Sequence, residues 1–446
     1  MPYGLRYFQY GDSDRAYRTE NKENTMVKTI KASIITVAVL LLSWFLPWMY
    51  SFIFAKPYWS PFTLYSCIVH TFASIDYDED GNMKGRDFNG KTYTEHQFDS
   101  ILPVFYARQL ASENRFPESI EGIPISLESA EKSSFIFRSA PSDLNRKKPG
   151  IYQILESRPD RVNFKTPDDV FRITKNGIEF VDIKTNKINV RKSEIFSEAL
   201  KQTGFAFPAA IISGNSNTKK EYDNGYLITD SSGSLFHIRQ EHGSPKTAKI
   251  NIPDNLEISD IFVTEFPDRK LMGFISGVNG ELMALSAEDY SIHEVPVGGF
   301  FPRKEQIMIV GDMFYWTVNI QSLESERIVA VNPRNWKCVG SHTPEIKVEE
   351  WEKIPEYIFP FSLEFISPLD EYIRPRIENI SLKALWTGAF LMLLYAAGSY
   401  FCKKRNKSDS VNRGSHRILT SLALYSTILI FGIYAFIPLI VRGGMK

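Results

Sequence analysis

The chain has 446 residues, with 52 Lys and Arg against 52 Asp and Glu, so its formal net charge is zero. Hydrophobic residues make up 43% of it, and the mean hydropathy is -0.20. This composition excludes a disordered chain, a collagen-like repeat, a disulfide-dense scaffold and a carrier that is embedded in a membrane throughout. A length of this order allows roughly two to four domains.

Three apolar segments, each flanked by basic residues, are long enough to cross a bilayer, which takes about 20 helical residues. We expect one transmembrane helix in each: residues 32–55, 383–402 and 418–441. Trp44 and Trp48 lie near the end of the first segment, as is typical of side chains at the headgroup level. No small-x-small cleavage site follows this segment, so we expect an anchor and not a signal peptide. A buried core helix is the alternative for each segment.

The orientation follows from the loop at residues 403–417, which holds six Lys and Arg against one Asp. Short loops rich in Lys and Arg stay cytoplasmic. We therefore expect a cytoplasmic tail at 1–31 and an extracytoplasmic location for residues 56–382 and the C-terminal residues 442–446. Translation from Met26 is an alternative to the tail. Residues 32–382 carry a net charge of -10, which argues against nucleic-acid binding.

The first part of the outer region, residues 56–165, is predicted to be α+β. Thr94 and Gln97 have the spacing of a capping box, and apolar residues then recur at helical spacing. A helix is therefore expected to begin at Thr94. Pro103 is expected to bend it.

The next part, residues 166–342, is typical of short strands separated by turns, with a helical insertion at 192–202. Three strand pairs begin at Leu235, Glu281 and Arg327, which are 46 residues apart in each step. A fixed spacing of this size favours propeller blades. A propeller-like domain is expected, and another all-β arrangement is the alternative.

The remaining residues of the outer region, 343–382, are rich in Pro and Glu. We expect them to form a linker that returns the chain to the membrane.

One stretch has the D-x-D-x-D-G spacing of a calcium loop: Asp76, Asp78 and Asp80, with Gly81 after them. The twelfth position is Asp87, where such loops have Glu. We take these four aspartates as the candidate metal ligands, with calcium as the one candidate cofactor. An acidic β-turn is the alternative.

Cys67 and Cys338 both lie in the outer region, where a disulfide is permitted, and two lone thiols are the alternative. His237 and His242 match no common zinc spacing, so His237 is expected to be a hydrogen-bonded structural residue. No catalytic motif of a serine hydrolase, metalloprotease or nucleotide-binding protein occurs in the sequence.

The sequence resembles an uncharacterised family of bacterial inner-membrane proteins, known as a domain of unknown function, over most of residues 56–340. The resembling residues are Lys56-Pro57, Pro61-Phe62, Tyr65-Ser66, Tyr93-Thr94, Phe98-Asp99, Leu102-Pro103, Pro167-Asp168-Asp169-Val170-Phe171-Arg172, Phe205-Ala206-Phe207-Pro208 and Asp223-Asn224-Gly225-Tyr226. Members of that family occur near components of ABC-type transporters. The resemblance supplies no activity and no catalytic residue.

These observations predict a non-catalytic membrane protein with a large periplasmic β-rich domain. The first hypothesis is an accessory subunit that partners a separate ATPase or permease of an ABC-type transporter. The alternative is an extracytoplasmic ligand-binding or sensor module, for which an aromatic-lined pocket in the outer domain would be the discriminating feature. A third hypothesis is an extracytoplasmic hydrolase, which would need convergent carboxylates or a nucleophile with its base.

Overall fold

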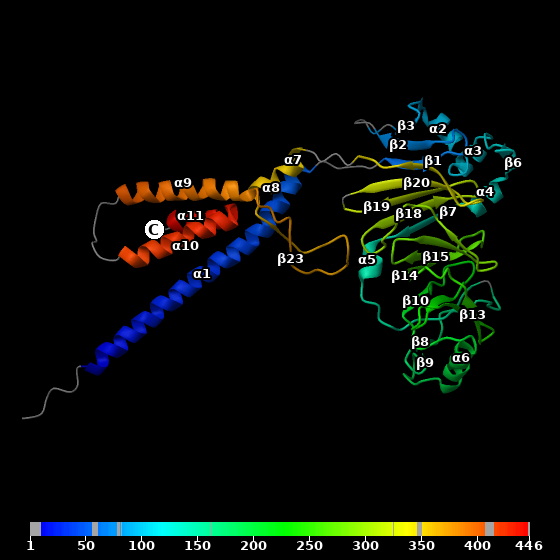
Figure 1. Cartoon of the computed structure of the whole chain (residues 1–446), viewed down its shortest axis with the longest axis horizontal. Helices are drawn as coiled ribbons and strands as arrows, with labels where there is room; N and C mark the ends of the chain where they lie inside the picture. The colour runs from blue at the N-terminus through cyan, green and yellow to red at the C-terminus, as the bar shows by residue number, and fades with distance from the viewer. Residues whose placement is uncertain are drawn as a thin grey trace, which may run out of the picture. The chain divides into compact units, whose positions relative to one another are not determined.

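The computed structural model describes residues 10–55, 61–77, 81, 83–161, 163–323, 325–345, 350–405 and 414–444. The chain forms two compact units, and each is described here by itself (Figure 1). The sheet unit comprises residues 59–346 and 368–371. The helical unit comprises residues 1–58, 347–367 and 372–446.

The sheet unit contains four antiparallel sheets of four or five strands, and within each the strands follow one another along the chain with a single exception. Sheet I consists of β1 (Phe62–Tyr65), β2 (Phe72–Tyr77), β3 (Met83–Asp87) and β4 (Thr92–Tyr93). Sheet II consists of β18 (Gln306–Gly311), β19 (Trp316–Gln321), β20 (Glu326–Asn332), β21 (Lys337–His342) and the exception, β7 (Phe135–Ser139). Sheet III consists of β14 (Ile258–Val263), β15 (Leu271–Gly277), β16 (Leu282–Ser286) and β17 (Ile292–Glu294). Sheet IV consists of β10 (Ile211–Gly214), β11 (Tyr226–Thr229), β12 (Leu235–Glu241) and β13 (Ser244–Ile250).

Shorter elements fill the rest of the sheet unit. They are α2 (Glu95–Ile101), α3 (Ala107–Ser112), β5 (Ser119–Ile120), β6 (Ile123–Pro124), α4 (Leu127–Ser133), α5 (Pro141–Asn145), β8 (Asp169–Ile173), β9 (Ile178–Asp182) and α6 (Val190–Gln202). The helix expected at Thr94 does begin there, and Gln97 Oε1 accepts a hydrogen bond from Thr94 N at 3.2 Å. The structure divides the following helical pattern into α2 and α3, which begin on either side of Pro103.

The sheets stack face to face in the order IV, III, II, I (Figure 1). One apolar core joins sheets IV and III through Leu227, Leu235, Ile275 and Leu285. A second core joins sheets III and II through residues such as Phe274, Ile309 and Val318. A third, smaller one joins sheets II and I through Phe72, Ile328 and Ala330. Each sheet is narrow, and its apolar side chains are buried by packing on the adjacent sheets.

The expected propeller is not found, although its strand repeat is present. The strands predicted at Leu235, Glu281 and Arg327 are β12, β16 and β20, each displaced by at most one residue. In the part of the chain that the structure describes, however, the sheets do not close into a ring. The stack has two different ends, the β8–β9 hairpin with α6 beyond sheet IV and sheet I beyond sheet II (Figure 1). The sheet unit is therefore a β-rich stack.

Among the described residues of the helical unit, two helices are long and apolar enough to cross a membrane, at Ala32–Phe54 and Ala384–Phe401. They belong to α1 (Tyr10–Phe54) and α9 (Ala384–Arg405). The other elements of this unit are α7 (Glu350–Lys353), α8 (Pro355–Ile358), β22 (Ser362–Glu364), β23 (Arg376–Glu378), α10 (Gly414–Phe431) and α11 (Ile433–Gly444).

The third expected span, residues 418–441, is not supported as one helix. The chain breaks at Gly432, whose φ is +52°, so α10 ends at Phe431 and α11 begins at Ile433. A positive φ interrupts the helical hydrogen-bond ladder, and glycine adopts it without steric cost. Tyr434 in α11 is buried and donates a hydrogen bond to Phe361 O at 2.5 Å, which ties α11 to the segment before β22.

Cys67 and Cys338 are free thiols, the first buried and the second exposed. The structure therefore contains no disulfide between them; the alternative of two lone buried thiols is confirmed for Cys67 and wrong in burial for Cys338. Cys67 lies in the turn after β1, whereas Cys338 lies on β21, the edge strand of sheet II.

Candidate functional site

A pocket of about 600 Å³ lies in the sheet unit, between sheet I, the α2–α3 segment and sheet II. Its volume falls within the range of small-molecule sites, roughly 300–1,000 Å³. Strand β1 supplies Leu64 and Tyr65, and strand β7 supplies Phe135 and Ile136. The turn between β18 and β19 supplies Asp312 and Tyr315, and the stretch from Leu102 to Gln109 supplies most of the opposite wall.

Aromatic rings dominate the walls of this pocket. The rings of Tyr65 and Tyr315 lie 4.9 Å apart, and those of Phe105 and Tyr106 lie 5.0 Å apart. Burial raises the pKa of Tyr106 to about 12, so its hydroxyl stays protonated. Tyr65 N donates a hydrogen bond to Thr317 Oγ1 at 2.8 Å, which fixes β1 against β19 across the floor of the pocket.

Asp312 is the one carboxylate that the β18–β19 turn brings into the pocket. Its Oδ1 accepts hydrogen bonds from Phe314 N at 2.7 Å and Tyr315 N at 2.9 Å, as in an Asx turn. Burial nevertheless raises the pKa of this carboxyl group from 3.8 to about 6, against the lowering effect of the two backbone donors. Asp312 is half-buried, and a partly desolvated carboxylate beside aromatic rings favours a ligand group that carries positive charge or donates hydrogen bonds.

Ion-paired side chains lie next to residues that line the pocket. Tyr315 donates its hydroxyl hydrogen to Glu121 at 2.7 Å, and Glu121 also lies 3.4 Å from Arg334. On the opposite side Arg108 contacts Glu131 at 2.5 Å, and the Arg108 side chain is largely exposed. The guanidinium groups of Arg108 and Arg334 are therefore already paired with carboxylates.

Cys67 also lines the pocket, but its chemistry does not favour catalysis. Burial, followed by the negative charges of Asp312 and Glu121, raises the pKa of its thiol to about 12. A thiol in this state is a weak nucleophile, because the thiolate is the reactive form. The arrangement can therefore bind a ligand and offers no activated sulfur.

Of the four predicted calcium ligands, the structure describes Asp76 and Asp87, and these two lie apart. Asp78 and Asp80 lie outside the described residues. Asp76 is exposed at the end of β2 and pairs with Lys84, whereas Asp87 pairs with Ala73, three positions along the same strand. That offset is about 10 Å at roughly 3.3 Å per residue.

Asp87 is committed to its own turn, where it accepts hydrogen bonds from Tyr93 Oη, Asn89 N and Lys91 N. Within the described ranges, no group of three or more His, Cys, Asp and Glu side chains is placed to hold a metal ion. Calcium binding stays a prediction.

His237 is a structural residue, as expected. It is buried in β12, and its two ring nitrogens lie 2.6 Å from Asn224 O and 2.8 Å from Tyr290 Oη. Burial lowers its pKa to about 4, so the ring is neutral at ordinary pH.

Asp312, Cys67 and the aromatic walls are the functional candidates that the sequence patterns missed. One local signal existed, since Gly311-Asp312 between two apolar runs is typical of a turn. Nothing local showed that this turn would lie beside residues 65 and 106.

A family model described as a domain of unknown function (DUF4857) matches residues 62–331, a range that contains most of the pocket. No curated protein matches the chain.

Solved structures with partial similarity include hydrazine synthase of Kuenenia stuttgartiensis (TM-score 0.24, 12% identity, 49% of this chain and 53% of that one). They also include PorZ, a surface component of the type-IX secretion system of Porphyromonas gingivalis (TM-score 0.21, 9% identity, 64% and 32%). A third is the N-terminal domain of Nup159 (TM-score 0.23, 10% identity, 53% and 57%). The chain thus spans about half of the hydrazine synthase chain and a third of PorZ, and at these TM-scores none of them informs the function.

Proposed function

The chain belongs to the family described as a domain of unknown function (DUF4857), and from that premise we propose that it is a membrane-anchored ligand-binding protein. The pocket beside sheet I is the single observation that carries this proposal. It combines a volume of about 600 Å³, aromatic side chains on its walls and the half-buried carboxyl group of Asp312, and it lies in the part of the chain that matches the family.

Membrane anchoring is supported by apolar side chains that the protein itself leaves uncovered. Leu41 and Phe52 on α1 are exposed, as are Trp386 and Leu393 on α9. The helices of a water-soluble core would bury such residues, whereas lipid accepts them. The basic loop at 403–417 supports a cytoplasmic position for the link between α9 and α10, and thus an extracytoplasmic sheet unit at the inner membrane of a bacterial cell.

The chemistry of the pocket favours a small ligand with an aromatic or apolar body and a primary amine. The aromatic walls around Tyr65, Phe105 and Tyr106 would hold the body. Asp312 would accept hydrogen bonds from the ammonium group and neutralise its charge. An anionic ligand is disfavoured, because Asp312 and Glu131 lie on the lining and the guanidinium of Arg108 is already paired with Glu131.

Benzylamine and benzoate are a matched pair of probes for this proposal, since they share a ring and differ in the sign of their charge. Benzylamine should raise the melting temperature of the purified full-length protein, and benzoate should not. Asp312→Asn should weaken benzylamine binding by at least about tenfold, because a hydrogen bond to a charged group contributes about 1.5–3 kcal/mol. Thermal unfolding across a concentration series measures both effects.

Asp254→Asn is the control variant, because Asp254 is an exposed aspartate of the same unit that lies far along the chain from every pocket residue and is not part of the lining. It should bind benzylamine as the unmodified protein does. Equal responses to benzylamine and benzoate, or an unchanged response in Asp312→Asn, would overturn the assignment of an amine ligand.

An accessory role beside an ABC-type transporter is the second candidate. It is favoured by apolar side chains exposed on the β9–α6 segment, at the end of the stack away from sheet I: Ile183, Ile188, Val190 and Ile195. Exposed apolar residues of this kind mark protein interaction sites. Recovery of an ATPase subunit with the protein from native membranes would favour this role, and the two roles are compatible in one chain.

A further inference from the structure

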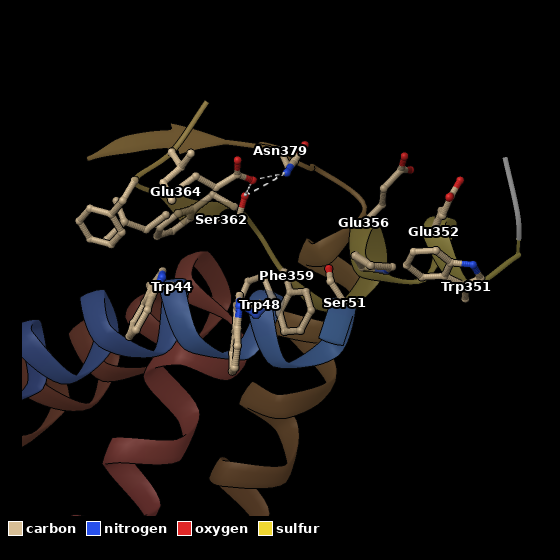
Figure 2. Close-up of a pocket in the computed structure, with 16 residues that line it drawn as sticks. Trp44, Trp48, Ser51, Trp351, Glu352, Glu356, Phe359, Ser362, Glu364 and Asn379 are labelled. Atoms are coloured by element: carbon tan, nitrogen blue, oxygen red, sulfur yellow. Dashed lines mark hydrogen bonds between the residues drawn. The ribbon is translucent and has the colours of Figure 1, made fainter. Parts of the chain in front are cut away.

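A second cavity, of about 560 Å³, lies within the helical unit and is independent of the pocket beside sheet I (Figure 2). The last turns of α1 form one wall with Trp44, Trp48 and Ser51. The segment from α7 through β22 forms the other walls, and Asn379 closes the cavity from the chain after β23. All of these residues belong to the same compact unit.

The cavity lies at the end of both candidate spans. Trp48 and Ser51 are within the last two turns of α1, which ends at Phe54. Glu356 on the cavity wall forms an ion pair with Lys383, which directly precedes α9. If α1 and α9 cross the bilayer, as proposed above, these helix ends lie at the level of the lipid headgroups.

Indole rings line one side of the cavity. Trp48 is 52% exposed and Trp44 is 43% exposed, and one face of the Trp48 ring stacks on Phe52, with ring centroids 5.5 Å apart. Trp44 also meets Phe365 edge to face, with ring centroids 6.1 Å apart, which holds it beside the segment after β22. Indole faces attract cations through their quadrupole.

Carboxylates give the other side its charge. Glu352, Glu356 and Glu364 line the cavity, and among the described lining residues there is no Lys or Arg. Glu364 is held in place, because its Oε1 accepts hydrogen bonds from Ser362 Oγ at 3.0 Å and Asn379 Nδ2 at 3.1 Å (Figure 2). Two basic residues are neighbours of these glutamates. Arg376 lies opposite Glu364 in the β22–β23 register, and Lys383 forms an ion pair with Glu356.

We propose that this cavity binds the headgroup of a phospholipid that ends in a primary ammonium group, such as phosphatidylethanolamine. The ammonium would enter between the indole faces and Glu364, while the phosphate would stay at the entrance. A primary ammonium donates hydrogen bonds to a carboxylate, which a quaternary ammonium cannot do. Phosphatidylglycerol would meet an acidic lining and be repelled. The inference rests on the proposed membrane anchoring and is separate from ligand binding at Asp312.

The test uses the full-length protein reconstituted in nanodiscs of phosphatidylcholine that contain equal parts of phosphatidylethanolamine and phosphatidylglycerol. Native mass spectrometry of the protein released from them measures which lipid it retains. We expect retention of phosphatidylethanolamine over both other lipids. Glu364→Gln should reduce that retention at least about tenfold, because a neutral amide loses the attraction to the ammonium group. Trp48→Leu should reduce it as well while leaving the Glu364 hydrogen bonds in place.

Glu378→Gln is the matched control, because Glu378 is exposed on the same hairpin and does not line the cavity. It should leave lipid retention unchanged. Equal retention of the three lipids, or no effect of Glu364→Gln in a protein that still responds to benzylamine, would overturn the inference. Soluble phosphoethanolamine forms a further arm, and binding as strong as that of the lipid would overturn the assignment to a membrane source. Loss of the benzylamine response alone would count against the function proposed for the sheet unit and leave this cavity unaffected.

Discussion

At Asp312, burial and backbone hydrogen bonds act on one carboxyl group in opposite directions. Desolvation penalises the charged form, whereas the amides of Phe314 and Tyr315 stabilise it, and desolvation is the larger effect. The result is a pKa of about 6, close enough to neutrality for the charge of the pocket to change with modest acidification. The same residue would then control both ligand binding and the stability of the sheet unit.

The stability of the sheet unit is expected to depend on pH through Asp312. Its folded pKa of about 6 is above the ordinary aspartate value of 3.8, so the folded state binds more protons than the unfolded state between those values. The stability that this residue contributes is therefore present below pH 3.8 and is lost as pH rises to about 6. Thermal unfolding of the full chain across this range should show a smaller decrease in Asp312→Asn.

Burial also raises the pKa values of Asp99, Asp260 and Glu265. The contribution of Asp312 is therefore the difference between the pH profile of Asp312→Asn and that of the unmodified protein. Those groups give a trend of the same sign in both proteins. Identical pH profiles of the two proteins would show that Asp312 titrates at its ordinary pKa.

Single residues were predictable from the sequence only where their environment is local. Glycine and aspartate spacing marked Asp76 and Asp87, and the structure places Asp87 in a turn hydrogen-bond network that involves residues 89–93. The role of Asp312 depends on the approach of Tyr65, which is more than 240 residues away in the sequence, to the β18–β19 strands. No periodicity within one segment carries that information.

At the scale of elements, the strands β12, β16 and β20 of sheets IV, III and II followed from the repeated spacing of strand pairs, whereas β10, β14 and β18 of the same sheets were not predicted. The α6 helix was also predicted, at 192–202 where the structure has Val190–Gln202. Strand β7 was missed, because it lies far from β18 in sequence and pairs with it only in the folded chain, with Phe137 opposite Ile309. Propeller closure was wrongly expected, because blade-like spacing describes one sheet and says nothing about how many sheets close a ring.

The packing of α2 on sheet I depends on a glycine in β3. A Cβ at Gly85 would clash with the ring of Phe98, which is fully buried. Gly85→Ala should therefore reduce the free energy of unfolding by about 1–3 kcal/mol, the usual effect of overpacking a core. Chemical denaturation of the purified protein measures this loss.

Phe98→Leu is the matched partner, because it removes the part of the ring that the new methyl group would meet. The double variant should lose less stability than the sum of the two single variants, since the substitutions are in contact. Strict additivity would contradict the proposed contact.

At the scale of the whole molecule, a native cysteine reports the orientation of the sheet unit. Cys338 is an exposed thiol on β21, whereas Cys67 is buried with a pKa raised to about 12. A membrane-impermeant maleimide should therefore label Cys338 in intact spheroplasts if the sheet unit is extracytoplasmic. Mass spectrometry of the labelled peptide measures the modification.

Cys338→Ser should remove this label and provides the control for reaction at other thiols. Labelling of Cys338 only after the membrane is lysed would place the sheet unit in the cytoplasm. It would also reverse the topology that the basic loop at 403–417 indicates.

The serial arrangement of sheets IV to I has a consequence for how the molecule opens. Sheets II, III and IV each share apolar cores with neighbours on both sides, whereas sheet I shares only a small core with sheet II and packs on α2 through another. Local unfolding should then start at the two ends of the stack and proceed one sheet at a time. The pocket with Asp312 borders sheet I, at one end of the stack. A ligand bound there would therefore stabilise the packing of sheet I on sheet II and oppose local unfolding at that end.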